Sequence, residues 1–405
     1  MSHAPSEETQ NRRRSRRAWA QVLLLLVAVP LGIASAWLLQ APTMEELEDK
    51  AAGGADAAAL LKMVHRASMY PEAAESLGQL LVRDAGAMRA LAGLAISHEE
   101  AMECLLSLAH YQPESLEYLR DLEIDYSFAL SLLERVPVDA METLAAYTEE
   151  CPNACFMMGV AYENGCHVPQ DWEQAAAWYG RAYDAGYELA ASYYAPAAYQ
   201  AGLASDELAA AADWFLEAAE CGYAAAQCAL GVCYAEVNDA ASAVYWYTQA
   251  AEQGLSDAQY NLGWCYLHGE GAAQDAAEAV RWFLQAAEQG DDLAQYYVGR
   301  AYELGEGVSQ DYAEAVRWYQ WSVEHQNAAA QCALGHCYAQ GLGVEQSWSR
   351  AVYYYQLSAE HNRSEAQLAL AHCYEQGLGV ARDAAMAQYW RECAAVTSQQ
   401  QLNES

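Results

Sequence analysis

The sequence predicts an all-α protein: an α/α superhelical solenoid of helix-turn-helix repeats, preceded by an N-terminal transmembrane or signal helix. Three observations support this fold class. Small and apolar residues recur at helical spacing through most of the chain. A unit of about 36 residues repeats from residue 151 onward. An apolar run without charge follows an arginine-rich start.

The first helix of one repeat is clearest in residues 258–290. Ala258, Leu262 and Tyr266 form an i, i+4, i+8 stripe, which is typical of an amphipathic helix and predicts the first helix of the unit, helix A. Gly269 opens a glycine-rich turn after this stripe. Glycine adopts positive φ without a Cβ clash, so the chain can reverse its direction there.

The second helix of the same unit, helix B, is predicted by its caps and its aromatic residues. Asp275 with Glu278 three residues later has the spacing of a capping box. Trp282 and Phe283 follow on the apolar face, and Gly290 stands where a left-handed C-terminal cap would end the helix. One unit is therefore a helix-turn-helix pair.

Copies of this unit follow one another along the chain. The opening alanine of helix A recurs at Ala154, Ala191, Ala226, Ala258, Ala294, Ala330 and Ala366, and the last three steps are each 36 residues. The aromatic of helix B recurs at Trp178, Trp214, Trp246, Trp282, Trp318, Tyr354 and Trp390. One helix pair cannot bury both of its sides, whereas stacked copies form a continuous core.

The chain divides into five predicted segments. Residues 1–17 are a basic cytoplasmic region, and residues 18–40 are a transmembrane anchor or signal peptide. Residues 43–150 are a helical region of degenerate repeats or a cap, with a separate small helical domain as the alternative. Residues 151–396 hold seven repeats, and residues 397–405 are a disordered tail.

The apolar N-terminal segment sets the predicted localisation. A helix over residues 18–39 reaches roughly 33 Å, enough for a hydrocarbon core of about 30 Å. The arginines before it favour a cytoplasmic N-terminus, so we expect a single-pass membrane protein with its repeats on the extracytoplasmic, periplasmic side. Ala34, Ser35 and Ala36 are typical of a cleavage site, and secretion after signal cleavage is the alternative.

The charge of the chain limits the classes of partner that we expect it to bind. The formal net charge is −35, although five arginines lie in the first 17 residues. A field of this sign repels phosphate backbones and anionic lipid surfaces. We therefore expect no nucleic-acid partner and favour a basic protein or peptide, with the membrane contacted only by the N-terminal helix.

The repeated motif, Ala-x-x-x-Leu-Gly-x-x-Tyr-x-x-Gly-x-Gly-Val-x-x-Asp followed by Ala-x-x-Trp-Tyr-x-x-Ala-Ala-x-x-Gly, resembles the Sel1-like repeat. Residues 294–326 and 366–395 match it closely. The resemblance implies a solenoid related to tetratricopeptide arrays. It also implies an adaptor or scaffold that binds proteins in signalling, secretion or envelope assembly.

The sequence predicts no enzyme activity and no cofactor. It contains no nucleophile elbow, phosphate loop or paired-carboxylate site, because its glycine pairs lie between helices and not after strands. An exported, membrane-tethered scaffold is the favoured function. The alternatives are an envelope enzyme or metal-dependent sensor that uses His and Cys residues, and a luminal quality-control adaptor of the endoplasmic reticulum.

The candidate partner-binding residues are the third and seventh positions of helix A, which point away from the stripe of Ala, Leu and Tyr. In the last four units they are Tyr260 and Trp264, Tyr296 and Arg300, Cys332 and His336, and Leu368 and His372. Exposed aromatic and arginine side chains in a ladder are typical of a peptide-binding groove. Ordinary packing of helix A against its neighbours is the competing interpretation.

A metal hypothesis rests on Cys332, His336 and His372, which would supply soft ligands for zinc or copper. Cys337 and Cys373 fall on the core side, away from the histidines. The sequence has no C-x-x-C and no H-x-x-x-H motif. The pattern therefore favours no metal site.

Two cysteines bracket the turn between units. Cys221 and Cys228 are the candidates for a disulfide, with two free thiols as the alternative. Cysteine also exchanges with alanine in the slot before the tyrosine of helix A, at Cys233, Cys265, Cys337 and Cys373. That exchange predicts small buried residues.

Overall fold

A computed structural model describes residues 57–67, 124–133 and 151–404, together with single positions between residues 47 and 148. These described residues are helical and contain no strand, as the sequence predicts. The segments predicted at 1–17 and 18–40 lie outside them. None of the helices found in the described part is long and apolar enough to cross a membrane.

The described residues fall into two compact units, which meet in the sequence between Asp206 and Glu207. The first unit contains α3 (Ala57–Ala67), α7 (Tyr126–Leu133), α9 (Pro152–Asn164), α10 (Trp172–Asp184), the 3-10 turn η3 (Glu188–Ala190) and α11 (Ala191–Ala204). Its core is aromatic: the ring of Phe156 lies 5.5 Å from Tyr179 and 5.1 Å from Tyr187.

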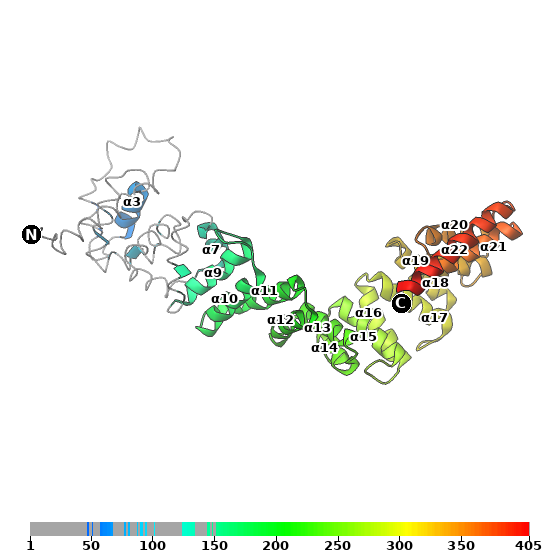
Figure 1. Ribbon diagram of the computed structural model, residues 1–405, viewed down its shortest axis with the longest axis horizontal. Coiled ribbons are helices and arrows are strands. Elements are labelled where there is room, and N and C mark those ends of the chain that lie inside the picture. The colour runs from blue at the N-terminus through cyan, green and yellow to red at the C-terminus, as the bar shows by residue number, and fades with distance from the viewer. Residues whose placement is uncertain are drawn as a thin grey trace, which may run out of the picture. The chain divides into compact units, whose positions relative to one another are not determined.

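The second unit is a stack of helix pairs that follow one another in chain order (Figure 1). Its helices are α12 (Leu208–Glu220), α13 (Ala224–Glu236), α14 (Ala240–Glu252), α15 (Ser256–His268), α16 (Ala276–Glu288), α17 (Asp292–Leu304), α18 (Tyr312–Glu324), α19 (Ala328–Gln340), α20 (Trp348–Glu360), α21 (Ser364–Gln376) and α22 (Ala384–Glu404). The odd-numbered helices from α13 to α21 are helix A of their repeats, and the even-numbered ones are helix B.

Local sequence signals explain where these helices begin and end. The Asp275 carboxylate accepts hydrogen bonds from the backbone N–H groups of Ala277 and Glu278 at 3.0 and 3.1 Å, so it caps α16 as predicted. The Glu278 side chain instead pairs with Arg281, one turn further along the helix. Gly269 closes α15 with a φ of 75°, in the left-handed region.

The seam between helix A and helix B is a contact of glycine with an aromatic ring. A Cβ atom added to Gly263 would lie 2.8 Å from the Phe283 ring, and one added to Gly299 would lie 2.7 Å from the Tyr319 ring. The same contact joins Gly159 to Tyr179, Gly231 to Tyr247 and Gly335 to Tyr355. The ring therefore lies directly on the backbone of helix A, where only glycine leaves room.

Buried glutamines connect successive helix pairs at the second position of helix A. The Gln259 side chain donates a hydrogen bond from Nε2 to the Ala251 carbonyl of the preceding helix B at 3.2 Å. The same bond is made by Gln227, Gln295 and Gln367. Each bond pairs the buried amide nitrogen of the glutamine and fixes one helix pair against the next.

The C-terminal residues differ from their prediction. The tail expected to be disordered at 397–405 is helical through Glu404, as the end of α22. Thr397 is buried, and its Oγ1 donates a hydrogen bond to Oε1 of Gln367 at 3.3 Å. This contact with helix A of the last repeat extends α22 beyond the repeat itself.

Candidate functional site

The candidate site is the set of eight predicted partner-binding residues, which we call the helix-A ladder. Its members lie on α15, α17, α19 and α21 of the second unit, at the third and seventh positions of each helix A. They are Tyr260, Trp264, Tyr296, Arg300, Cys332, His336, Leu368 and His372. The structure separates the third positions from the seventh positions.

The third positions of α15 and α17 are part of the packing between repeats. The Tyr260 ring lies 5.8 Å from Phe283 and 6.0 Å from Tyr297 of the next helix A. Burial is the largest cause that raises the pKa of Tyr260 to about 12, and it also raises the pKa of Tyr296. For these two tyrosines the competing interpretation, packing against neighbouring helices, describes their contacts.

The third position is exposed only in α21, whereas Tyr260 and Tyr296 are partly exposed. Leu368 is 53% exposed, whereas Cys332 in the preceding helix A is buried. In the described structure no further helix A lies against Leu368. Its exposure therefore follows from its place in the stack and not from a different local geometry.

The seventh positions form the accessible edge of the ladder. Arg300 and His372 are exposed, and Trp264 and His336 are partly exposed. The Trp264 ring stacks on His268 with centroids 4.0 Å apart and meets the Tyr297 ring edge-on at 5.5 Å. These contacts hold the indole in one orientation, which lowers the entropy that it would lose on binding.

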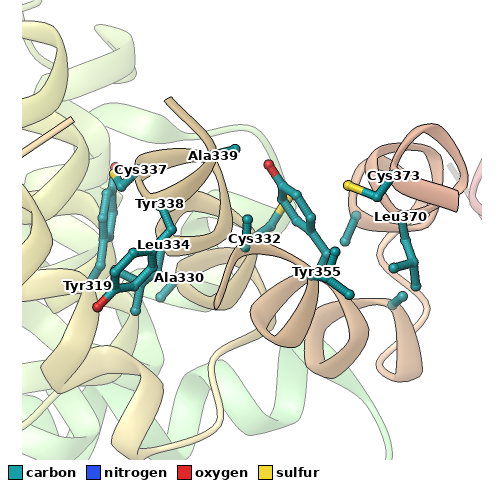
Figure 2. Close-up of a cluster of buried hydrophobic side chains, with 14 of the residues drawn as sticks. Tyr319, Ala330, Cys332, Leu334, Cys337, Tyr338, Ala339, Tyr355, Leu370 and Cys373 are labelled. Carbon is teal, nitrogen blue, oxygen red and sulfur yellow. The ribbon is translucent and has the colours of Figure 1, made fainter. Parts of the chain in front are cut away.

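A polar cluster lies between α19 and α21. The Cys332 Sγ is 3.5 Å from Nε2 of His336, and that nitrogen is 3.5 Å from Oε1 of Glu365. The Tyr355 hydroxyl lies 2.9 Å from His336 Nδ1. Figure 2 shows Tyr355 between Cys332 and Cys373.

The cluster does not provide an activated nucleophile. Burial is the main cause that raises the pKa of Cys332 to about 12, and the charge of Glu365 adds to it. The thiolate is the nucleophilic form of cysteine, so the thiol stays protonated and unreactive near neutral pH. Nothing in this pair resembles the Cys–His arrangement of a hydrolase, in which the thiol pKa is lowered.

The structure changes the composition of the ligand set in the metal hypothesis, which the sequence did not favour. Cys332 and His336 come together as the sequence suggests, because they are one turn apart on α19. His372 is exposed and lies outside the cluster, and Glu365 takes its place. Cys337 and Cys373 are buried in the core, as predicted.

The candidate disulfide between Cys221 and Cys228 is not formed in the structure, in which both thiols are free, as the alternative has it. Cys221 is exposed at the end of α12. Cys228 is buried inside α13, and its sulfur accepts a weak hydrogen bond from Asn261 of α15 at 3.8 Å. The two side chains therefore have different surroundings, and only Cys221 is accessible.

Three features of the site were missed in the sequence. Tyr297 touches Trp264, Tyr260 and Phe283. Its only signal is the Tyr-Tyr pair at the third and fourth positions counted from the opening alanine, Ala294. The buried glutamines had a clear signal, since the second position of helix A is Gln in five consecutive repeats. Glu365 had none, because it belongs to the repeat after His336.

The comparisons with known proteins agree with this repeat structure. The family model described as the Sel1 repeat matches residues 152–187, 224–255, 256–291, 292–321, 328–362 and 364–395. The chain is a Sel1-repeat protein. The unit from Ala191 to Gly222 is not matched, and its helix A, α11, differs from the others in containing Pro196.

A solved structure with an SLR fold has a fold similar to that of this chain. A structure of c5321, a protective antigen of uropathogenic Escherichia coli strains with an SLR fold, matches with a TM-score of 0.53 and 24% identity over 89% of this chain and 91% of that one. A Sel1-repeat protein of Oxalobacter formigenes matches with a TM-score of 0.43 and 27% identity over 67% of this chain and 97% of that one. No curated protein sequence matches. Sel1-repeat proteins generally bind other proteins as non-enzymatic scaffolds.

Proposed function

We propose that this Sel1-repeat protein is an exported, membrane-tethered scaffold that binds a basic protein or peptide along the accessible edge of the helix-A ladder. The observation that carries the proposal is the seventh-position edge, where Trp264 and Arg300 lie in consecutive repeats. Leu368 is exposed in the last repeat. Tryptophan and arginine dominate the energetics of protein interfaces. The helices that carry these two residues are packed against helix B by the contacts of Gly263 with Phe283 and of Gly299 with Tyr319.

The charge of the chain supports the choice of partner. The formal net charge of −35 creates a field that attracts cations over a Debye length of about 8 Å at physiological salt. Such a field accelerates encounter with a basic partner and adds less to affinity than the anchors do. Association should therefore slow as salt is raised.

The tether is proposed from the sequence of residues 18–39, which contain no charged residue and follow five arginines. A segment of this length and polarity favours insertion with a cytoplasmic N-terminus. An anchor and a cleaved signal peptide would both export the repeats.

One experiment tests binding and tethering together. A photoreactive residue at His268, which is exposed and stacked on Trp264, is activated in intact cells, and the cells are then fractionated. We expect a crosslinked protein in the membrane fraction. The double change Trp264→Ala and Arg300→Ala should weaken binding by at least about thirtyfold, the effect of a hot spot of about 2 kcal/mol, and so abolish the crosslink.

A matched control places the same two changes on helix B. Trp321 is 48% exposed on α18, and Arg317 is exposed on the same helix, so Trp321→Ala with Arg317→Ala should leave the crosslink unchanged. A crosslink that survives the Trp264 and Arg300 changes would refute the proposed surface. Recovery of the full-length chain in the soluble cytoplasmic fraction would refute the tether.

A further inference from the structure

The polar cluster of Cys332, His336 and Glu365 has the composition of a metal site. Cys332 and His336 project from adjacent turns of α19, and Glu365 reaches them from the first turn of α21 in the next repeat. One ligand atom from each residue lies within 4.8 Å of the other two. In the described residues this is the one such group of three.

Two of the three distances between the ligand atoms fit a tetrahedral ion, and the third, between Cys332 and Glu365, is within 4.8 Å. Zinc binds sulfur at about 2.3 Å and nitrogen or carboxylate oxygen at about 2.0 Å, so tetrahedral angles place the sulfur and nitrogen about 3.5 Å apart and the nitrogen and oxygen about 3.3 Å apart. The observed distances are 3.5 Å from Cys332 Sγ to His336 Nε2 and 3.5 Å from that nitrogen to Glu365 Oε1. An ion could therefore enter with side-chain adjustments alone.

The second shell is also present. His336 directs Nε2 toward Cys332 and Glu365, while its Nδ1 lies 2.9 Å from the buried Tyr355 hydroxyl. A metal-bound histidine usually donates its other N–H to a carboxylate, a backbone carbonyl or water, which fixes the tautomer with a free lone pair on the ligating nitrogen. Here the Tyr355 hydroxyl oxygen is placed to accept that bond. Tyr355 thus holds the ring in the orientation that coordination needs.

We infer that Cys332, His336 and Glu365 form a binding site for a divalent transition metal, with Zn²⁺ as the preferred ion. A thiolate and a carboxylate balance the two positive charges, and the thiol proton passes to solvent as the metal–sulfur bond forms. Three protein ligands leave one coordination position for water or for a donor atom of a bound partner. Arg363 lies near Cys332, and its positive charge repels a metal cation bound there.

The next repeat lacks the same set, which provides controls. His372 occupies the slot of His336, but Leu368 stands where Cys332 would be. Cys337 is adjacent to His336 in sequence and is buried in the core. Neither His372 nor Cys337 belongs to the cluster, so removing either side chain should leave the site intact.

The test uses the purified full chain, stripped with a chelator and titrated with Co²⁺, whose bond to thiolate produces a charge-transfer absorption in the near ultraviolet. We expect one Co²⁺ per chain with this absorption, and its displacement by Zn²⁺.

Cys332→Ser should abolish the absorption. His336→Ala and Glu365→Gln should lower the affinity by about tenfold or more, as should Tyr355→Phe through the second shell. His372→Ala and Cys337→Ser should change neither the stoichiometry nor the spectrum.

Folding is monitored by circular dichroism for every variant. If Cys332→Ser does not fold, Glu365→Gln and Tyr355→Phe still decide the question, because Glu365 is exposed and Phe283 already occupies the equivalent slot of an earlier repeat. The inference is overturned by substoichiometric binding, by bound Co²⁺ without the thiolate absorption, or by equal losses in the His372→Ala control. It does not depend on the proposed scaffold function.

Discussion

The seam and the helix-A ladder lie on the same helices, yet they vary differently from repeat to repeat. At the seam, a glycine of helix A meets an aromatic ring of helix B in each pair from α13 to α20. At the ladder, the third and seventh positions change from Tyr and Trp in α15 to Cys and His in α19. A position that meets the same neighbour in every copy keeps one residue type, whereas a position that meets solvent or the next copy can diversify.

The last repeat shows that the two sides of the seam are coupled. Ala371 replaces the glycine of helix A, and Arg391 replaces the aromatic residue of helix B. Ala371 is 1% exposed, and Arg391 instead forms an ion pair with Glu375 at 2.6 Å. Loss of the ring therefore coincides with gain of a methyl group, so these two differences within the chain support a direct packing constraint.

The largest expected effect comes from breaking the seam. Phe283→Ala removes a ring that is 1% exposed and lies on the backbone of Gly263, leaving a cavity between α15 and α16. We expect the free energy of unfolding to fall by about 3–5 kcal/mol. Chemical unfolding followed by circular dichroism measures the loss.

Arg391→Ala is the matched control, because Arg391 occupies the same slot of the last repeat without a seam glycine. Its side chain is 42% exposed, and surface ion pairs of this kind contribute at most about 1 kcal/mol. A loss for Phe283→Ala as small as that for Arg391→Ala would mean that the seam does not stabilise the stack.

An intermediate effect is expected where a turn of one repeat touches helix B of the preceding repeat. Gly307 has a φ of 76°, and a Cβ atom there would lie 2.3 Å from the Ala276 carbonyl oxygen. Gly307→Ala should therefore combine the cost of a left-handed residue, about 1–2 kcal/mol, with an overpacking cost of about 1–3 kcal/mol.

Gly290→Ala separates these two costs. Gly290 has a φ of 99°, but its Cβ direction meets no atom within 4 Å, so only the backbone cost should appear in the measured unfolding free energy. In the next two repeats Gln326 and Asn362 hold this slot with φ values of 63° and 57°. Equal losses for the two alanine variants would show that the contact with Ala276 is unimportant.

The seam and the helix boundaries were largely predictable, because they depend on short-range patterns that recur. The stripe of Ala258, Leu262 and Tyr266, the cap at Asp275 and the glycine at 290 each act within a few residues, and the structure confirms them. The tail after residue 396 was mispredicted because its helix depends on a contact between Thr397 and the distant Gln367.

The site was predictable only in part, because its geometry depends on the following repeat. A helical wheel places Tyr260 and Trp264 on one side of α15, but it cannot show that Tyr297 of α17 covers Tyr260. For the same reason the wheel suggested His372 beside His336. The stagger between successive repeats brings Glu365 there instead.

The smallest expected effect is that of a substitution at the N-terminus of a ladder helix. It tests whether this position tolerates a change of residue as the third and seventh positions do. Asp291 caps α17 and accepts a hydrogen bond from the Ala294 N–H at 2.7 Å, while Asn327 makes the same bond to Ala330 at 3.0 Å in α19. Burial is the main cause that raises the pKa of Asp291 above its ordinary value. Asp291→Asn keeps the cap and removes the buried charge.

The raised pKa fixes the sign of the pH dependence. The folded protein holds the Asp291 proton more tightly than the unfolded chain does, so this stabilisation is complete below the ordinary carboxyl pKa and is lost as the pH rises through the raised folded value. Asparagine does not titrate, so Asp291→Asn should gain stability relative to the native chain across that window and hold the gain at higher pH. The gain should stay below about 1 kcal/mol, because a negative charge at a helix N-terminus is itself stabilising by about 0.3–1 kcal/mol. Unfolding midpoints of the variant and the native chain, measured from about pH 3 to pH 7, test this difference. Asn327→Asp in α19 is the reverse exchange, so its stability relative to the native chain should change with pH in the opposite direction. A difference that does not vary with pH would mean that burial of Asp291 has no energetic consequence.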